Sequence, residues 1–170
     1  MDLIDKIKEF RNFPKKGIQF KDFSEILKSP LTLRYVCDEI SKYYHTKDVD
    51  VFAGIESRGF PIACALAIKY NKGMIMIRKK GKLPGKTTQT QYKTEYEKSV
   101  MEIQNDAVKK NQRIIICDDL LATGGTAQAA AKIIEKRHGK VAGFAFIIEL
   151  TELGGRNVIN KYKCKTLIQY

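Results

Sequence analysis

The hydrophobic positions of this chain switch between short apolar runs and helix-like spacing along most of its length. Apolar runs predict strands at 49–55, 74–77, 113–117, 141–150 and 166–168. Apolar residues at helical spacing predict helices at 60–70, 125–136 and 156–161. Alternating strands and helices are typical of a parallel sheet with right-handed crossovers and helices on both faces. We therefore predict an α/β fold in which residues 1–170 form a single domain.

The N-terminal part of the chain has a different pattern. Apolar residues at helical spacing predict a short amphipathic helix over the first ten residues. Residues 13–21, interrupted by Pro14 and Gly17, predict a structured loop with apolar anchors. Ser29 and Pro30 supply an N-cap and a proline suited to the first position of a helix, so a helix is expected to begin there.

One long polar segment interrupts the alternation of strands and helices. Residues 78–93 contain glycine, proline, threonine, glutamine and lysine without a clear period, and they predict an exposed connection. An extended ribbon is expected to follow at 96–103. The chain contains no internal repeat or linker that would divide it.

Size and composition fit a globular protein that does not enter membranes. The chain has 170 residues, of which 44% are hydrophobic, and its longest apolar run, 141–148, is far shorter than the roughly 20 residues of a membrane-spanning helix. Asp2 and Asp5 stand where a secretory signal would carry positive charge. The four cysteines lack the paired spacing of a zinc site or disulfide framework, and we expect them to be buried in a reducing compartment. These features predict a cytoplasmic location.

The net charge of +12 indicates a partner that carries phosphate. Nucleic acids and small phosphorylated substrates would both be attracted by it. Several of the lysines fall within the single segment 78–86, and the others are dispersed as on an ordinary solvated surface. This distribution favours a small substrate, and no nucleic acid partner is expected.

The most informative segment is 114–126, which reads IIICDDLLATGGT. An apolar strand ends in Asp118 and Asp119, and a glycine turn then leads into a helix. Ligands of open α/β sheets bind beyond the carboxyl ends of strands, and the free N–H groups of a helix N-terminus suit a phosphate. The adjacent carboxylates fit hydrogen bonds to sugar hydroxyls or a nearby divalent cation. The segment therefore predicts a sugar-phosphate site, with an ordinary strand-to-helix turn as the alternative.

This segment resembles the signature of type I phosphoribosyltransferases. Three further blocks, 13–22, 53–60 and 77–85, carry the resemblance along the whole chain. It implies a parallel sheet flanked by helices, a small N-terminal hood within residues 1–30 and a mobile lid loop at 78–96. It also implies purine salvage, in which adenine and 5-phosphoribosyl 1-pyrophosphate give AMP and pyrophosphate, with Mg²⁺ as cofactor and a homodimer as the assembly.

The resemblance assigns roles around the phosphoribosyl group. The 5-phosphate would bind at Ala122, Thr123, Gly124, Gly125 and Thr126. Asp118 and Asp119 would bind the ribose hydroxyls and are candidates to contact Mg²⁺, which the substrate itself mainly holds. Ser57 and Arg58 match a pyrophosphate loop that contains a non-proline cis peptide. Positive charge on the pyrophosphate side would come from Arg58, Arg78, Lys79 and Lys82.

The resemblance also assigns the proton transfer and the base. Glu95 matches the catalytic carboxylate that handles the proton of the purine, and Tyr96 would orient it. The hood over adenine would consist of Ile18, Gln19, Phe20 and Lys21, with Phe20 stacked on the ring. Lys21 stands where the family often has arginine, and Gln19 replaces a small apolar residue of some relatives, so the hood contacts are expected to differ in detail.

Three alternatives remain open at the level of sequence. Another purine base could be the acceptor on the same fold. The chain could be a regulator that senses phosphoribosyl pyrophosphate, although the residues before the first strand lack a clear helix-turn-helix pattern. A structural α/β protein without a ligand is the remaining alternative.

Overall fold

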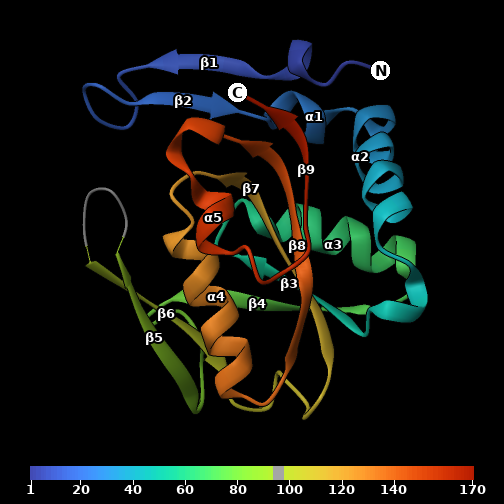
Figure 1. Ribbon diagram of the computed structural model, residues 1–170, viewed down its shortest axis with the longest axis vertical. Coiled ribbons are helices and arrows are strands. Elements are labelled where there is room, and N and C mark those ends of the chain that lie inside the picture. The colour runs from blue at the N-terminus through green and yellow to red at the C-terminus, as the bar shows by residue number, and fades with distance from the viewer. Residues whose placement is uncertain (94–97) are drawn as a thin grey trace.

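The computed structural model describes residues 1–93 and 98–170 and is built around one seven-stranded sheet. The strand order is β5-β6-β4-β3-β7-β8-β9, shown in Figure 1. The parallel strands are β4 (Gly73–Lys79), β3 (Val51–Ile55), β7 (Arg113–Leu121), β8 (Lys140–Glu149) and β9 (Cys164–Gln169). At one edge, β6 (Lys98–Gln104) pairs antiparallel with both β4 and β5 (Thr87–Lys93). The predicted α/β fold is confirmed.

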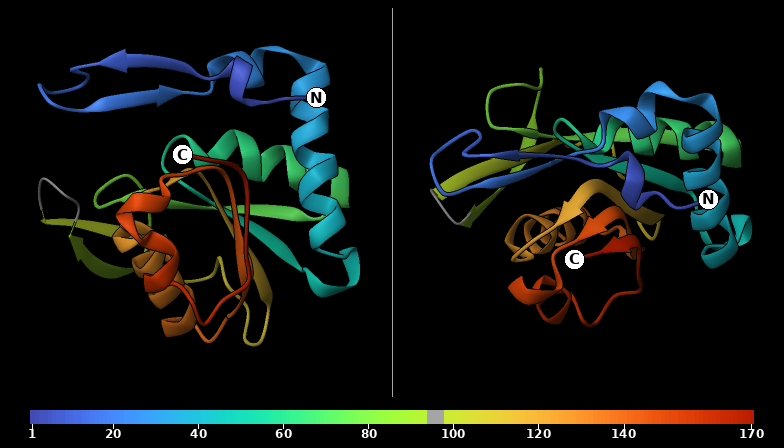
Figure 2. Two further views of the ribbon diagram at one scale, coloured as in Figure 1. Left: turned by 45° about the horizontal axis from the view of Figure 1, so that its top comes forward. Right: turned by 90° about the horizontal axis from the view of Figure 1, so that it is seen from above.

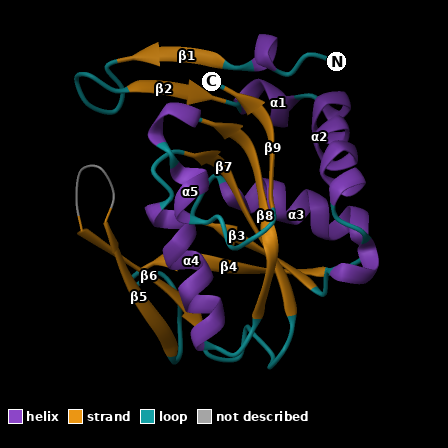
Figure 3. Ribbon diagram, in the orientation of Figure 1, coloured by secondary structure: helices purple, strands orange, loops and turns teal. Residues whose placement is uncertain are grey.

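Helices cover both faces of the sheet, as Figures 2 and 3 show. The helices α2 (Pro30–Tyr43) and α3 (Gly59–Tyr70) pack on one face, with α1 (Ser24–Lys28) beside them. The helix α4 (Gly125–Lys136) packs on the other. Alternate residues of the central strands enter the two cores, so β3 is buried along its whole length. Burial on both faces explains why these strands read as continuous apolar runs.

The prediction of an N-terminal helix is wrong. The structure has a 3₁₀ helix η1 (Ile4–Lys6) followed by β1 (Lys8–Arg11), which pairs antiparallel with β2 (Gln19–Asp22). Leu3 is buried and Ile7 packs against the core, but Ile4 and Phe10 are exposed, so the described residues cover only part of the predicted apolar stripe. Pairing between β1 and β2 satisfies the backbone instead. The loop predicted at 13–21 therefore turns into a strand in its last part.

The helix predicted at Ser29 is confirmed. The Ser29 hydroxyl accepts a hydrogen bond from the Thr32 N–H at 3.5 Å, and Pro30 is the first residue of α2. A second 3₁₀ helix, η2 (Thr46–Asp48), connects α2 to β3.

The remaining boundaries differ in detail from the predictions. The polar segment 78–93 contains the end of β4, a turn and the strand β5. The predicted ribbon is the strand β6, and its first residues lie outside the described part of the chain. Near the C-terminus, η3 (Thr151–Leu153) and a short helix α5 (Gly155–Val158) replace the longer predicted helix.

The cysteines and the helix lengths complete the comparison. All four cysteines are free, and Cys64 is exposed on α3, contrary to the expectation that all are buried. Within the described residues, no helix has both the length and the apolar character needed to cross a bilayer.

Candidate active site

The site forms where β3 ends beside the C-terminal part of β7. These parallel neighbours pair Gly54 with Cys117, so the residues that follow β3 lie beside Asp118 and Asp119 of β7. Arg58, which follows β3, places its Nε atom 3.0 Å from Oδ2 of Asp119 on β7. Two residues predicted from separate motifs thus form one ion pair at the edge where α/β folds bind ligands.

The adjacent carboxylates of Asp118 and Asp119 experience an unfavourable environment. Burial, together with repulsion from Asp119, raises the pKa of Asp118 well above its ordinary value. Burial also raises the pKa of Asp119, although the Arg58 guanidinium opposes the shift. Within the described chain, the buried Arg58 Nη1 has no hydrogen-bond partner, and the buried Asp119 Oδ2 has none beyond its ion pair with Arg58 Nε. Buried polar groups normally have partners, so these atoms are suited to a ligand.

The glycine turn after β7 opens the N-terminus of α4. Gly124 has φ +84°, a conformation that favours glycine, and α4 begins at Gly125 with no side-chain cap. A cavity of about 200 Å³ lies here, and its lining includes Asp118, Asp119, Thr123 and Thr126. Free N–H groups, hydroxyls and the helix dipole make this cavity suitable for a phosphate.

A larger cleft of about 840 Å³ adjoins this cavity. Its hood side is lined by Ile18, Gln19, Phe20 and Lys21, and it shares Arg58, Ala122, Thr123 and Thr126 with the smaller cavity. The Arg58 guanidinium lies 4.5 Å from the centroid of the Phe20 ring, and Phe13 contacts that ring edge-on at 5.0 Å. The aromatic wall of the cleft can accommodate a planar base beside the phosphate cavity.

Lys21 of the hood has partners that the sequence did not predict. Its side chain is buried, forms an ion pair with Glu9 of β1, and lies 3.6 Å from the centroid of the Tyr170 ring. Gln19 also donates to Glu9. Tyr170, the last residue of the chain, lines the cleft. Nothing local in the sequence indicates Glu9, because its partner lies on a different strand.

The basic segment is held as a folded turn by two carboxylates. Glu56 accepts hydrogen bonds from Arg78 Nε at 3.2 Å, Arg78 Nη2 at 3.3 Å and the Lys79 N–H at 2.8 Å. Glu102, which is buried, accepts from the N–H groups of Lys82 and Leu83, each at 3.0 Å. Arg78, Lys79 and Lys82 are therefore close together, but they do not line the two cavities.

The remaining predicted residues are placed as follows. The Glu56–Ser57 peptide bond is cis, as the resemblance implied for the pyrophosphate loop. Glu95 and Tyr96 lie outside the described residues. They fall between Lys93 and Lys98, which pair at the end of the β5–β6 hairpin.

The acidic pair fits a magnesium ion shared with a substrate. Among the described residues, no group of three or more histidine, cysteine, aspartate or glutamate side chains could hold a metal. Mg²⁺ in phosphate-binding enzymes often takes one or two carboxylates and completes its octahedron with substrate oxygens and water. Asp118 and Asp119 can supply such carboxylates, since both line the cavity beside the start of α4.

Comparisons with known proteins agree with this geometry. A family model described as phosphoribosyl transferase domain matches residues 22–169. The adenine phosphoribosyltransferase of Nitrosopumilus maritimus is 64% identical over the full length of both chains. The crystal structure of adenine phosphoribosyltransferase from Thermoanaerobacter pseudethanolicus has a TM-score of 0.94 at 40% identity, covering 99% of this chain and 98% of its own. The Saccharomyces cerevisiae enzyme, solved with adenine and an imino-altritol bisphosphate, has a TM-score of 0.90 at 34% identity, covering 97% and 96%.

Proposed function

This chain belongs to the adenine phosphoribosyltransferase family, and we propose that it converts adenine and 5-phosphoribosyl 1-pyrophosphate to AMP and pyrophosphate in purine salvage. The observation that carries the proposal is the continuity of the two cavities. A phosphate-sized cavity at the start of α4 opens into a cleft with an aromatic wall, and Arg58 lines both. A nucleoside monophosphate needs a phosphate site and a site for a planar base next to each other.

In this proposal the substrate lies along the edge of the sheet. The 5-phosphate binds the turn from Ala122 to Thr126, and the ribose hydroxyls donate to Asp118 and Asp119. Adenine occupies the larger cleft on its hood side, against Phe20, with Ile18, Gln19 and Lys21 around it. The buried Asp119 Oδ2, whose one printed contact is its ion pair with Arg58, and the open N-terminus of α4 support this arrangement.

The reaction breaks the bond between ribose C1′ and a pyrophosphate oxygen and forms a bond from C1′ to N9 of adenine. Arg58 is next to the ribose site, and the turn that holds Arg78, Lys79 and Lys82 supplies further positive charge for the leaving pyrophosphate. Ser57 follows the cis peptide and would present its N–H to the same group. Mg²⁺, bound to substrate oxygens and within reach of Asp118 or Asp119, would neutralise further negative charge.

Glu95 is proposed to manage the proton that adenine loses, with Tyr96 orienting its carboxylate. A general acid or base contributes about 10²- to 10⁴-fold in rate. The arms of the β5–β6 hairpin flank the segment that contains both residues. We propose that residues 78–96, which include Glu95 and Tyr96, act as a lid over the site, since an oxocarbenium-like ribose reacts with any water that reaches it.

The proposal is tested by measuring pyrophosphate release with phosphoribosyl pyrophosphate, Mg²⁺ and each of adenine, hypoxanthine, guanine and xanthine. Turnover with adenine alone is expected. Turnover with another base would leave the mechanism but overturn the assignment of the hood. Tight binding of phosphoribosyl pyrophosphate without turnover on any base would indicate a sensor.

Asp119→Asn tests the role of the acidic pair. We expect kcat/KM to fall about 10²- to 10³-fold, the loss typical of one preorganised electrostatic group. The fold should persist, because asparagine has nearly the same shape. Asp50→Asn, at the opposite end of the strands, is the control and should retain activity. Near-normal turnover of Asp119→Asn would contradict the proposed role.

We also propose that the chain forms a homodimer in the cytoplasm. The helix α3 is apolar around most of its circumference, and Ile68 on α3 and Met76 on the adjacent β4 are exposed. A helix that is hydrophobic on all sides is usually covered, and a second copy would cover it. Light scattering should give twice the mass of one chain. The four free thiols support a reducing compartment.

A further inference from the structure

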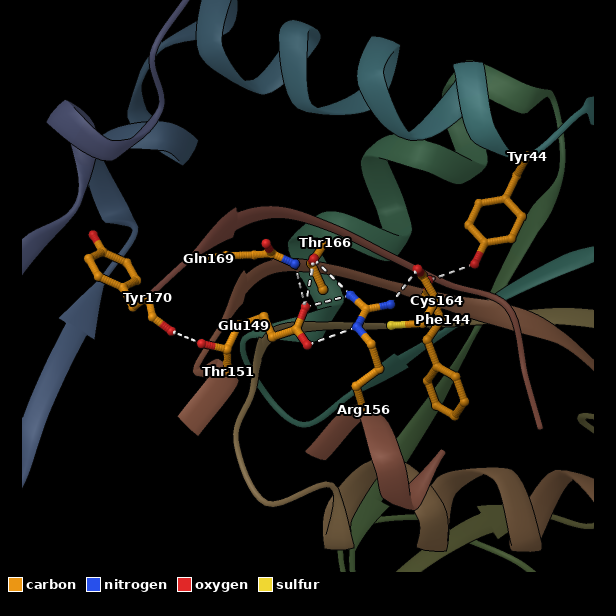
Figure 4. A network of polar contacts seen from close by, with 9 residues as sticks. All are labelled: Tyr44, Phe144, Glu149, Thr151, Arg156, Cys164, Thr166, Gln169 and Tyr170. Atoms are coloured by element: carbon orange, nitrogen blue, oxygen red, sulfur yellow. Dashed lines mark hydrogen bonds and ion pairs between the residues drawn. The ribbon is translucent and has the colours of Figure 1, made fainter. Parts of the chain in front are cut away.

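A buried carboxylate at the end of β8 gathers four hydrogen bonds (Figure 4). Glu149 accepts from Arg156 Nε at 2.8 Å and from Arg156 Nη2 at 2.5 Å, a two-point contact with the guanidinium. Thr166 Oγ1 donates at 2.9 Å and Gln169 Nε2 at 3.2 Å, both from the neighbouring strand β9. None of these residues belongs to the catalytic machinery proposed above.

Arg156 is held on its other side as well. Its Nη1 atom donates to the Cys164 carbonyl oxygen at 3.1 Å, and Nη2 also lies 3.0 Å from Thr166 Oγ1. The hydrogen bonds from Arg156 lower the pKa of Glu149, so the pair is ionised at neutral pH. Two-point arginine–carboxylate contacts are directional, so this pair defines the position of α5, the element that carries Arg156.

The position of α5 matters because α5 contacts the turn from Ala122 to Thr126, called the phosphate turn below. A Cβ atom at Gly155, the first residue of α5, would lie 2.1 Å from the Ala122 carbonyl oxygen and 2.9 Å from the Gly124 nitrogen. In the reverse direction, a Cβ atom at Gly124 would lie 2.7 Å from the Gly155 carbonyl oxygen and 2.9 Å from Val158 Cβ. The two backbones are therefore in direct contact.

A helix as short as α5 cannot hold its position by itself. It spans only Gly155–Val158, and isolated helices of fewer than about 12 residues are marginal in water. Arg156 connects it to β8 and β9, which belong to the central sheet. The pair thus connects the rigid sheet to the turn that would bind the phosphate.

We propose that Arg156 and Glu149 are positioning residues for the 5-phosphate: they fix α5, and through Gly155 they fix the backbone N–H groups of the turn from Ala122 to Gly124. This inference rests on the proposed function and assigns no contact between Arg156 and the substrate. It predicts a selective effect on ligands. Ligands with a 5-phosphate should lose affinity when the pair is broken, whereas the hood side of the larger cleft and the acidic pair stay intact.

The chain offers a matched control for this test. Arg113 also makes a two-point contact, with Asp50, through Nε at 3.0 Å and Nη2 at 2.7 Å, and it donates from Nη1 to the Lys47 carbonyl oxygen. Its side chain is 42% exposed, as is that of Arg156. Arg113 begins β7, at the end of the strand away from the phosphate turn. Arg156→Met and Arg113→Met therefore each remove a two-point ion pair, from opposite ends of the sheet. The two carboxylates differ in burial, since the side chain of Glu149 is 4% exposed and that of Asp50 is 34% exposed, so thermal unfolding of both variants accompanies the comparison.

The experiment is calorimetric titration of each variant with ribose 5-phosphate, alongside thermal unfolding. Arg156→Met is expected to lower the affinity for ribose 5-phosphate at least about tenfold. A small misplacement of a positioning group can lower the rate of a reaction by up to about 100-fold. The affinity of Arg113→Met for ribose 5-phosphate should stay within about twofold of that of the unmodified protein, because Arg113 lies far from the phosphate turn. In turnover, Arg156→Met should raise KM for phosphoribosyl pyrophosphate far more than it lowers kcat. Equal affinities in the two variants would overturn the inference.

Two further variants keep the test decisive if Arg156→Met fails to fold. Arg156→Lys retains the charge but not the two-point contact, and it should give an intermediate loss. Gly155→Ala leaves the pair intact and moves the turn directly, so it should weaken ribose 5-phosphate as Arg156→Met does. Normal ribose 5-phosphate binding by Gly155→Ala would also contradict the inference.

The outcomes separate this inference from the proposed function. An unmodified protein that binds ribose 5-phosphate but has no turnover on any base would disprove the function while leaving the positioning test valid. Turnover with adenine, combined with normal ribose 5-phosphate binding by Arg156→Met, would disprove only the positioning role.

Discussion

At the scale of single residues, the acidic pair shows a conflict between stability and function. Asp118 and Asp119 are adjacent, and burial raises the pKa of both. A carboxyl whose pKa is higher in the folded state than in the unfolded state favours unfolding once the pH exceeds its unfolded value of about 4. Functional sites often retain such destabilising groups because the ligand needs them.

This conflict predicts the pH dependence of Asp118→Asn. At pH 7 the substitution should raise the midpoint temperature of unfolding, because it removes a carboxylate that is disfavoured in the folded state. The gain should disappear as the pH falls below about 4, where Asp118 is protonated in both states. Thermal unfolding at both pH values measures this. An identical gain at pH 7 and below pH 4 would show that charge is not the cause.

At the scale of elements, a buried carboxylate organises the basic turn between β4 and β5. Glu102 of β6 is only 2% exposed and accepts hydrogen bonds from Lys82 N, Leu83 N and the Thr87 hydroxyl. Burial alone would raise the pKa of Glu102, but these hydrogen bonds lower that pKa. The turn therefore has a defined shape in spite of its polar, glycine-containing sequence.

Glu102→Gln is expected to destabilise the protein by about 1–3 kcal/mol, the penalty for leaving buried donors unsatisfied. The glutamine amide can place an NH₂ group against the backbone N–H groups that the carboxylate now accepts. Urea unfolding measures the change. Glu135→Gln, which disrupts an exposed ion pair with Lys161, is the control and should change stability by less than about 1 kcal/mol. Similar losses in both variants would contradict the organising role of Glu102.

At the scale of the whole molecule, the N-terminal hairpin of β1 and β2 lies near the C-terminus, as Figure 1 shows. Lys21 of β2 lies 3.6 Å from the centroid of the Tyr170 ring, and Thr151 donates from its N–H and hydroxyl to the Tyr170 carbonyl oxygen at 2.9 and 2.6 Å. The hood is thus attached to the C-terminal strand across the site. Residues of the hairpin and Tyr170 both line the larger cleft, where we propose that adenine binds.

Tyr170→Leu should therefore raise KM for adenine about fivefold, since a cation–π contact contributes about 1 kcal/mol. The affinity for ribose 5-phosphate should stay within about twofold, because the phosphate turn does not contact Tyr170 in this proposal. Steady-state kinetics and calorimetry measure the two values. Tyr43→Leu, an exposed tyrosine at the end of α2, is the control. A similar weakening of the binding of adenine and of ribose 5-phosphate would indicate general destabilisation instead.

Local patterns in the sequence were enough to predict the features that depend on neighbouring residues. The alternation of strands and helices, the N-cap at Ser29 and the strand–turn–helix that carries Asp118 and Asp119 follow from local patterns. The boundaries that failed, such as the N-terminal helix, depend on whether a distant surface covers an apolar stripe. Leu3, Ile4, Ile7 and Phe10 recur at helical spacing, yet only Leu3 and Ile7 of these four pack against the core, and Ile4 and Phe10 are exposed.

The distant groups that support the site could be identified only from the tertiary structure. The ion pair of Glu9 with Lys21 joins two strands of the hood, and Tyr170 reaches the same lysine from the other end of the chain. Glu149 and Arg156 have no motif of their own, and their relation to the phosphate turn arises from the contact of Gly155 with Ala122. A local pattern carries no information about such contacts, because parallel crossovers bring together residues that are far apart in sequence.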